Sequence, residues 1–225
     1  GSVTAAANAR GWRCDGLVPA PALAARARQR LAPWPERRVF ECGLEDAAGR
    51  VPSNAYDLAW FSESFQYVAL DAGLEALRGA LAPDAAVVVF DVFARDDAPP
   101  GTSPLGGGHR LSEALSAFRR HGFDCVRDED HSVHMAPNLD LLQGLLRDRL
   151  RPAAATLDRF LAHRYRLAWG VLKWAQRHRL EKLERRWGAQ RDGATFLRYK
   201  TYRLLGFRRS DRRPRPAGAE GFIRR

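Results

Sequence analysis

The sequence predicts an α/β fold, with a doubly wound, mostly parallel sheet and a helical insertion before the last strand. Helical and strand-like segments alternate through the first 130 residues, in units of the length found in parallel α/β sheets. The run AVVVFDVF at 86–93 is almost continuously apolar and β-branched, which favours a strand buried on both faces. After Pro137 the pattern changes to long, arginine-rich helical segments. These observations together predict the fold class.

Each predicted element follows from its apolar spacing and from the residues that end it. Helices are expected at 4–10, 22–31, 70–81 and 110–121, followed by Gly11, Pro33, Pro83 and Gly122 respectively. Strands are expected at 12–18, 38–42, 56–61, 86–93 and 123–127, and after them come helices at 139–151 and 153–187 and an aromatic strand at 196–207. The chain therefore divides into a core at 1–135, a basic helical insertion or lid at 136–190, the last strand of the core at 191–209 and a disordered tail at 210–225.

The formal charge of +11 suggests a nucleic-acid partner, because clustered cations displace the counterions of phosphates. The composition argues against that interpretation. Lysine is scarce, and the arginine excess accompanies abundant alanine, as in proteins from GC-rich genomes. The positive charge also gathers after about residue 147, while the first half is nearly balanced. We therefore expect a small-molecule substrate rather than a nucleic acid.

The cysteines indicate a reducing compartment. Cys14, Cys42 and Cys125 are far apart, each lies in a short apolar run, and the sequence has no C-x-x-C pair. This pattern predicts buried, reduced thiols in a cytoplasmic protein, and it excludes a zinc site built on cysteine pairs. No run of about twenty apolar residues occurs, so the sequence predicts no membrane-spanning helix.

Four segments occur in a characteristic order and spacing. They are WRCDGLVPAPALAA at 12–25, RVFECGLED at 38–46, YDLAWFSESFQY at 56–67 and LEALRGALAPDAAVVVFDV at 74–92. In this order they resemble the second to fifth strands, with their neighbouring turns and helices, of class I S-adenosylmethionine-dependent methyltransferases. The resemblance covers roughly the first 130 residues. It implies S-adenosylmethionine as cofactor and methyl transfer to an oxygen, carbon or nitrogen atom of a small metabolite.

The resemblance also implies that the first strand of the family's sheet, with most of its glycine-rich loop, is missing. The opening residues Gly1 to Thr4 resemble the last glycine of that loop running into the first helix; the alternative is that Gly1 and Ser2 are a cloning scar. In this fold the first strand lies centrally, between strands two and four. We therefore expect an N-terminally truncated fragment with an unpaired seam in its sheet.

The cofactor contacts implied by the resemblance lie at the starts and ends of these segments: Gly1, Leu17, Val18, Leu44, Glu45, Phe61 and Ser62. Two positions depart from the family pattern. Val18 stands where an acidic residue usually holds the ribose hydroxyls, and Asp15 is on a different face of the strand. Leu44 stands where an aspartate often follows the third strand, and Glu45 or Asp46 is the alternative carboxylate.

Glu63, just past the fourth strand, is expected to contact the cofactor's amine or the acceptor, or to orient a base; a turn cap is the simpler role. Tyr67 and Asp91 are candidates for substrate binding, against a place in the core and a structural polar partner. His131 and His134 are candidate general bases, because a neutral imidazole can deprotonate an acceptor near pH 7. Without a third ligand they predict no metal site, and surface histidines remain the alternative.

The basic helical segment leaves several roles open: a lid over an apolar acceptor, a contact with an anionic carrier or a membrane surface, or a homodimer interface. An insertion of this size favours a bulky, hydrophobic acceptor such as a lipid, polyketide or polyene. Two other functions remain as hypotheses. One is a non-catalytic, methyltransferase-like scaffold, and the other is an RNA methyltransferase that uses the basic segment to bind its substrate.

Overall fold

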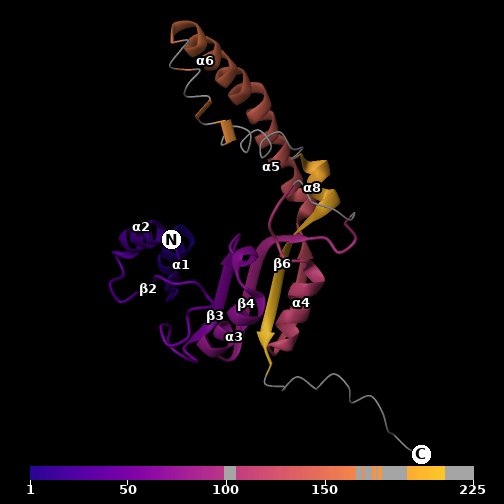
Figure 1. Ribbon diagram of the computed structural model, residues 1–225. Coiled ribbons are helices and arrows are strands. Elements are labelled where there is room, and N and C mark those ends of the chain that lie inside the picture. The colour runs from indigo at the N-terminus through magenta and orange to yellow at the C-terminus, as the bar shows by residue number, and fades with distance from the viewer. Residues whose placement is uncertain (99–104, 166–168, 170–173, 176, 179–191, 211–225) are drawn as a thin grey trace, which may run out of the picture. The chain divides into compact units, whose positions relative to one another are not determined.

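The computed structural model describes residues 1–98, 105–165, 169, 174–175, 177–178 and 192–210 (Figure 1). The first part contains α1 (Ser2–Asn8), β1 (Gly16–Leu17), α2 (Pro21–Leu31), β2 (Val39–Phe40), β3 (Tyr56–Ser62), the 3₁₀ turn η1 (Phe65–Tyr67), α3 (Leu70–Ala80) and β4 (Leu81–Ala94). The second part contains α4 (Leu111–Arg120), β5 (Phe123–Asp130), α5 (Ser132–Leu145), the π-helical turn η2 (Leu146–Leu150), α6 (Arg151–Arg164), α8 (Gly193–Tyr199) and β6 (Lys200–Arg209).

The strands form a four-stranded sheet in the order β3-β4-β6-β5 and a separate two-stranded sheet of β1 and β2. Both β1–β2 and β3–β4 pair in parallel, as the sequence predicts. Strand β6 runs antiparallel to β5, because Ser210 N–H donates to Gly122 O at one end and His131 N–H donates to Tyr202 O at the other.

The chain divides into two compact units. One comprises residues 1–91, 109–129 and the chain from 204, and the other comprises 92–108 and 130–203. Strands β4, β5 and β6 each have residues in both units. Because this division cuts through strands of the sheet, the predicted boundaries at 135, 190 and 209 stay a prediction.

An aromatic cluster forms the core of the first unit. Phe118 of α4 stacks on Phe207 of β6, with ring centroids 3.7 Å apart, and on Phe65 of η1, at 5.2 Å. Phe123 of β5 meets the Phe118 ring edge-on, with ring centroids 5.8 Å apart. All four phenylalanines are buried, and so are Val87 and Val89 of β4. Stacked and edge-on aromatic pairs of this kind bury large apolar surfaces in defined orientations, so they fix α4 and η1 relative to the sheet.

Strands β1 and β2 are shorter than expected. The sequence predicts strands at 12–18 and 38–42, whereas only Gly16–Leu17 and Val39–Phe40 are paired. Among the described strands β1 pairs only with β2, and β3 pairs only with β4. Strand residues without partners on either side lose the ladder that would keep them extended, which explains the short strands. The break lies where the sequence predicts an unpaired seam.

The structure after residue 191 differs from the prediction more than β1 and β2 do. Residues 193–199, expected within the last strand at 191–209, form α8 instead, because the side chain of Asp192 caps the helix by accepting the N–H of Thr195 at 2.8 Å. Strand β6 begins only at Lys200. Ser210, expected in a disordered tail, is held by its bond to Gly122, while 211–225 lie outside the described residues.

Helix α5 begins at Ser132, seven residues before the predicted helix at 139–151, so the predicted core boundary at 135 falls inside it. Helix α6 ends at Arg164, and most of the predicted helical segment beyond it, up to 187, lies outside the described residues. Cys125 is exposed rather than buried, because β5 is the edge strand of its sheet. Cys42 is buried and Cys14 is partly buried.

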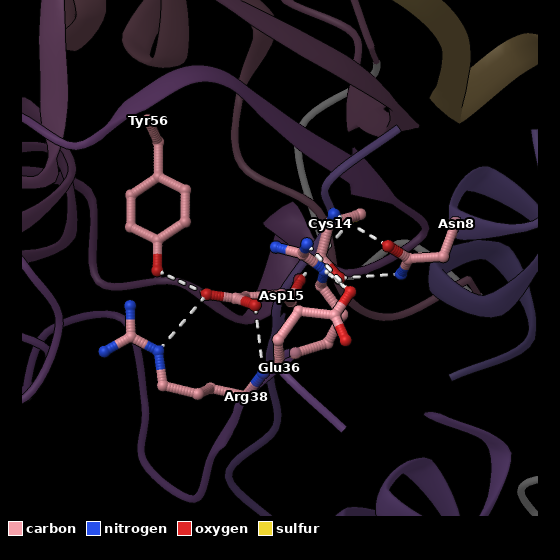
Figure 2. Close-up of polar contacts among 7 residues, drawn as sticks. Asn8, Cys14, Asp15, Glu36, Arg38 and Tyr56 are labelled. Carbon is pink, nitrogen blue, oxygen red and sulfur yellow. Dashed lines mark hydrogen bonds and ion pairs between the residues drawn. The ribbon is translucent and has the colours of Figure 1, made fainter. Parts of the chain in front are cut away.

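Asp15 links the β1–β2 sheet to β3 (Figure 2). Its Oδ1 accepts the backbone N–H of Arg38 at 2.9 Å, and its Oδ2 accepts the hydroxyl of Tyr56 at 2.9 Å and faces the Arg38 guanidinium at 3.6 Å. Asp15 precedes β1 and Tyr56 begins β3, so the contact joins the amino ends of the two strands. Burial, then the hydrogen bond to Asp15, raises the pKa of Tyr56 to about 12.

We expect the Tyr56–Asp15 bond to stabilise the fold at neutral pH and to fail in strong alkali. The unfolded phenol ionises near pH 10 and the folded phenol near 12, so the stabilisation is complete below about pH 10 and is lost as pH rises through 12. Tyr56→Phe should cost about 0.5–1.5 kcal/mol in urea unfolding at pH 8 and much less at pH 12. Absorbance at the phenolate band should show one fewer late-titrating tyrosine in the variant. An equal cost at both pH values would contradict this assignment.

Candidate functional site

The candidate site lies at the carboxyl end of β3, where ligands of parallel α/β sheets bind. Ser62 pairs with Phe90 of β4, and the next residue, Glu63, donates its N–H to Phe90 O at 2.9 Å. Glu63 has φ of 53°, a left-handed conformation that costs a residue with a side chain about 1–2 kcal/mol. Ser62 and Glu63 are exposed, and Phe61 is partly buried. Backbone strain of this kind at a strand end is frequent in ligand sites.

Asp91 and the η1 turn lie against this strand end. Asp91 is fully buried, and its Oδ2 accepts the N–H of Gln66 at 3.2 Å. Phe65 meets Phe61 edge-on, with centroids 5.4 Å apart. Asp91 therefore positions the turn rather than facing solvent. Tyr67, at the end of the turn, is 78% exposed, so it is not part of the core.

His109, which is not predicted from the sequence as a site residue, belongs to the same neighbourhood. Its ring lies 5.7 Å from that of Phe65, in an edge-on arrangement. Its Nε2 is buried and has no hydrogen-bond partner among the described residues. The sequence signal was a histidine directly after Gly106, Gly107 and Gly108, just before a helix; it is easily missed because a glycine run reads as a plain loop.

The residues expected at the start of the cofactor site lie near the first two helices and strands. Gly1 caps α1, and a Cβ added to it would come within 2.9 Å of Ala27 Cα in α2, so only glycine allows this close approach. Leu17 pairs with Phe40, and Val18 donates its N–H to Phe40 O at 2.9 Å. Asp15 is held at the opposite end of β1 (Figure 2), so it does not supply the carboxylate that Val18 lacks.

After β2, Leu44 and Glu45 take different roles. Leu44 is buried, and its Cδ2 would touch a Cβ on Gly73 of α3 at 3.6 Å, so its side chain belongs to the core. Glu45 is exposed, and its carboxylate lies over Gly43, where an added Cβ would meet Oε1 at 2.8 Å. Asp46 is exposed as well. Exposed carboxylates therefore follow β2 and β3 but not β1.

His131 and His134 belong to the second unit, whereas the residues at the ends of β1, β2 and β3 belong to the first. His131 donates its N–H to Tyr202 O, His134 donates its N–H to His131 O, and their ring centroids are 6.2 Å apart. His134 is exposed and His131 partly buried. No three His, Cys, Asp or Glu side chains in the described part of the chain are arranged to hold a metal ion.

A polar cluster that includes the buried residues Ser132 and Thr201 lies beside these histidines. The hydroxyls of Ser132 and Thr201 are 3.1 Å apart, and Thr201 donates to Asp130 Oδ2 at 3.3 Å. Burial raises the pKa of Asp130, but hydrogen bonds from Ser132 and the nearby Arg203 outweigh burial and lower it overall. Lys200 is also buried; it donates to Gly107 O, and burial lowers its pKa. These contacts anchor β6 and the glycine loop.

Two hollows on the described surface lie elsewhere. One, of about 420 Å³, is lined by the end of α2 and the start of β2. The other, of about 660 Å³, lies along α5. Neither is lined by Phe61, Ser62 or Glu63. No helix in the described ranges has the length and apolar character needed to cross a membrane.

Neither a family model nor a curated protein sequence matches this chain. Solved structures do match. A geranyl diphosphate C-methyltransferase from Streptomyces coelicolor A3(2), in complex with Mg²⁺, geranyl diphosphate and S-adenosyl-L-homocysteine, aligns with a TM-score of 0.62 at 15% identity, over 93% of this chain and 67% of that one. The O-methyltransferase of a trans-AT PKS multienzyme of Brevibacillus brevis, in complex with S-adenosyl-L-homocysteine, aligns with a TM-score of 0.52 at 15% identity, over 87% and 58%.

The [4+2]-cyclase SpnF aligns with a TM-score of 0.55 at 19% identity, over 87% of this chain and 65% of that one. The chain thus spans about two thirds or less of the length of these three proteins. Their agreement is one of architecture at low identity. The chain has the α/β fold of the class I S-adenosylmethionine-dependent methyltransferases.

Proposed function

We propose that this protein transfers a methyl group from S-adenosylmethionine to a small, hydrophobic metabolite in the cytoplasm. The fold carries the proposal, because solved structures that share it contain S-adenosylmethionine or S-adenosylhomocysteine. The acceptors named with such structures, geranyl diphosphate among them, support a hydrophobic substrate such as a lipid, polyketide or polyene. A shared fold does not determine a reaction, so the rest of the proposal depends on the residues at the carboxyl end of β3.

The residues at the strand ends fit such a cofactor in part. Glu45 and Glu63 offer exposed carboxylates after β2 and β3, suited to hydroxyl and amine groups. Phe61 supplies a partly buried aromatic edge, and Ser62 a hydroxyl. Val18 offers neither charge nor hydrogen bond from its side chain at the end of β1. A missing charged hydrogen bond of this kind costs about 1.5–3 kcal/mol, so we expect weakened rather than abolished binding.

When bound, S-adenosylmethionine supplies an electrophilic methyl group. The protein's contribution is to hold the acceptor in line with that group and to take up a proton where the acceptor carries one. Tyr67, exposed beside the strand end, is suited to contact an apolar acceptor, and Asp91 keeps the turn that bears it in place. His131 and His134 remain the candidate bases. No protein nucleophile is needed.

A non-catalytic, methyltransferase-like scaffold is the second candidate. Two observations favour it: Val18 at the ribose position and Leu44 buried in the core. The [4+2]-cyclase among the structural neighbours also demonstrates that this architecture is found with another named activity. Nothing in the described part of the chain specifically favours RNA as the substrate.

Restoring the carboxylate at the end of β1 tests the cofactor site. We expect Val18→Asp to bind S-adenosylhomocysteine about tenfold or more tightly than the unmodified chain in isothermal titration calorimetry, since it regains a charged hydrogen bond. Val18→Asn is the matched control, because asparagine has the size of aspartate without its charge. It should gain much less affinity. Thermal melts of both variants verify that the strand still folds. Absence of binding by all three forms at about 1 mM ligand would favour the scaffold.

Removing the carboxylate after β3 is the complementary test. We expect Glu63→Gln, which keeps the size of the side chain, to weaken S-adenosylhomocysteine binding by Val18→Asp about tenfold, as one charge-assisted hydrogen bond is lost. Asp57→Asn, an exposed carboxylate near the amino end of the same strand, is the control and should leave affinity within about twofold. Equal effects of the two substitutions would place Glu63 outside the site.

A further inference from the structure

Helices α5 and α6 expose many large apolar side chains. Of the sixteen exposed large hydrophobic residues in the described part of the chain, nine lie between 133 and 174: Val133, Leu141, Leu142, Leu145, Leu150, Leu157, Phe160, Tyr165 and Trp174. Scattered exposed apolar residues are normal, but a concentration of them marks an interaction surface. We call the exposed apolar residues from Leu141 to Phe160 the α5–α6 surface.

Helix α5 packs against α8 along one side. Its Asp140 accepts the N–H of Gly193 in α8 at 2.7 Å, and a Cβ on Gly193 would come within 2.8 Å of Ala136 O, so this side fits closely against α8. Leu141 and Leu145 are one turn apart and therefore neighbours on a different side. They are 73% and 52% exposed, and both line the 660 Å³ hollow. Both residues therefore keep at least half of their surface accessible.

The same segment carries most of the protein's charge. Residues 132–191 contain thirteen Lys and Arg residues against five acidic ones, which gives +8 of the total +11. Within the described range Arg147 and Arg149 directly follow the exposed leucines, and Arg159 and Arg164 lie on α6; all four are exposed. The exposed leucines and these arginines lie on one continuous helical segment, since α5, η2 and α6 follow one another without a break (Figure 1). The exposed leucines therefore lie in a segment of the sequence that is positively charged as a whole.

We propose that the α5–α6 surface binds the face of a membrane that contains anionic lipid. Such a membrane satisfies both features, because its headgroups attract arginines and its acyl boundary accepts leucine and phenylalanine side chains. A second copy of the chain would bring two segments of charge +8 together, which is unfavourable. Nucleic acid would use the arginines but leave the leucines in water. The proposal does not depend on methyl transfer.

The test is co-sedimentation of the 225-residue chain with vesicles, in about 100 mM salt so that surface charge is only partly screened. Vesicles of phosphatidylcholine with about one third phosphatidylglycerol should bind the protein at least tenfold more strongly than pure phosphatidylcholine vesicles. The double variant Leu141→Glu, Leu145→Glu should lose at least about tenfold of that binding. Both leucines are exposed, so the variant should keep its fold, as circular dichroism would verify.

The matched control is Leu23→Glu with Val126→Glu, which introduces the same two charges at exposed apolar positions outside this segment, 55% and 63% accessible. It should bind vesicles within about twofold of the unmodified chain. Equal losses of vesicle binding in both double variants would mean that only the net charge of the protein matters, and would overturn the proposal. Absence of binding to the anionic vesicles would overturn it as well. A dimer in light scattering that only the Leu141, Leu145 variant abolishes would assign the surface to a second copy instead.

Discussion

The stacking of Phe118 against Phe65 and Phe207 is the interaction on which the described site depends. It joins a helix, a turn and a strand that are distant in the sequence, and it leaves little freedom for the turn that follows β3. Because that turn is fixed, the N–H of Gln66 is in place to meet the buried carboxylate of Asp91. Phe61 and the strained Glu63 are then presented at the strand end by a rigid support.

A second constraint operates at the other end of the strands. Asp15 serves three groups at once, the N–H and the guanidinium of Arg38 and the hydroxyl of Tyr56. A carboxylate with this many partners is committed to structure, so the amino ends of β1 and β3 remain joined although no ladder links the two strands. The contacts of Asp15 thus stabilise the ends of β1 and β3 that lie opposite the candidate ligand site.

Most of the fold could be predicted from local pattern. The leucines of α3, the valines of β4 and the glycine after α4 each determine their element through nearby residues alone. What the pattern could not predict depends on contacts made at a distance. The start of β6 was predicted too early, because the aromatic residues of this segment favour a strand. The side chain of Asp192 caps a helix there instead, by accepting the N–H of Thr195. Leu44 could not be placed either, since its burial depends on Gly73. His109 was missed for the same reason, because only packing on Phe65 distinguishes it.

The break in the sheet has a consequence for how this polypeptide behaves in solution. Strand β3 has seven residues, pairs on one side only among the described strands, and carries the exposed side chain of Trp60. An open edge of that length is a template for another strand, and the geometry does not distinguish a strand of the same molecule from one of its neighbour. The unpaired edge of β3 therefore favours association between molecules. The protein should remain monomeric only in dilute solution, unless another strand pairs with that edge.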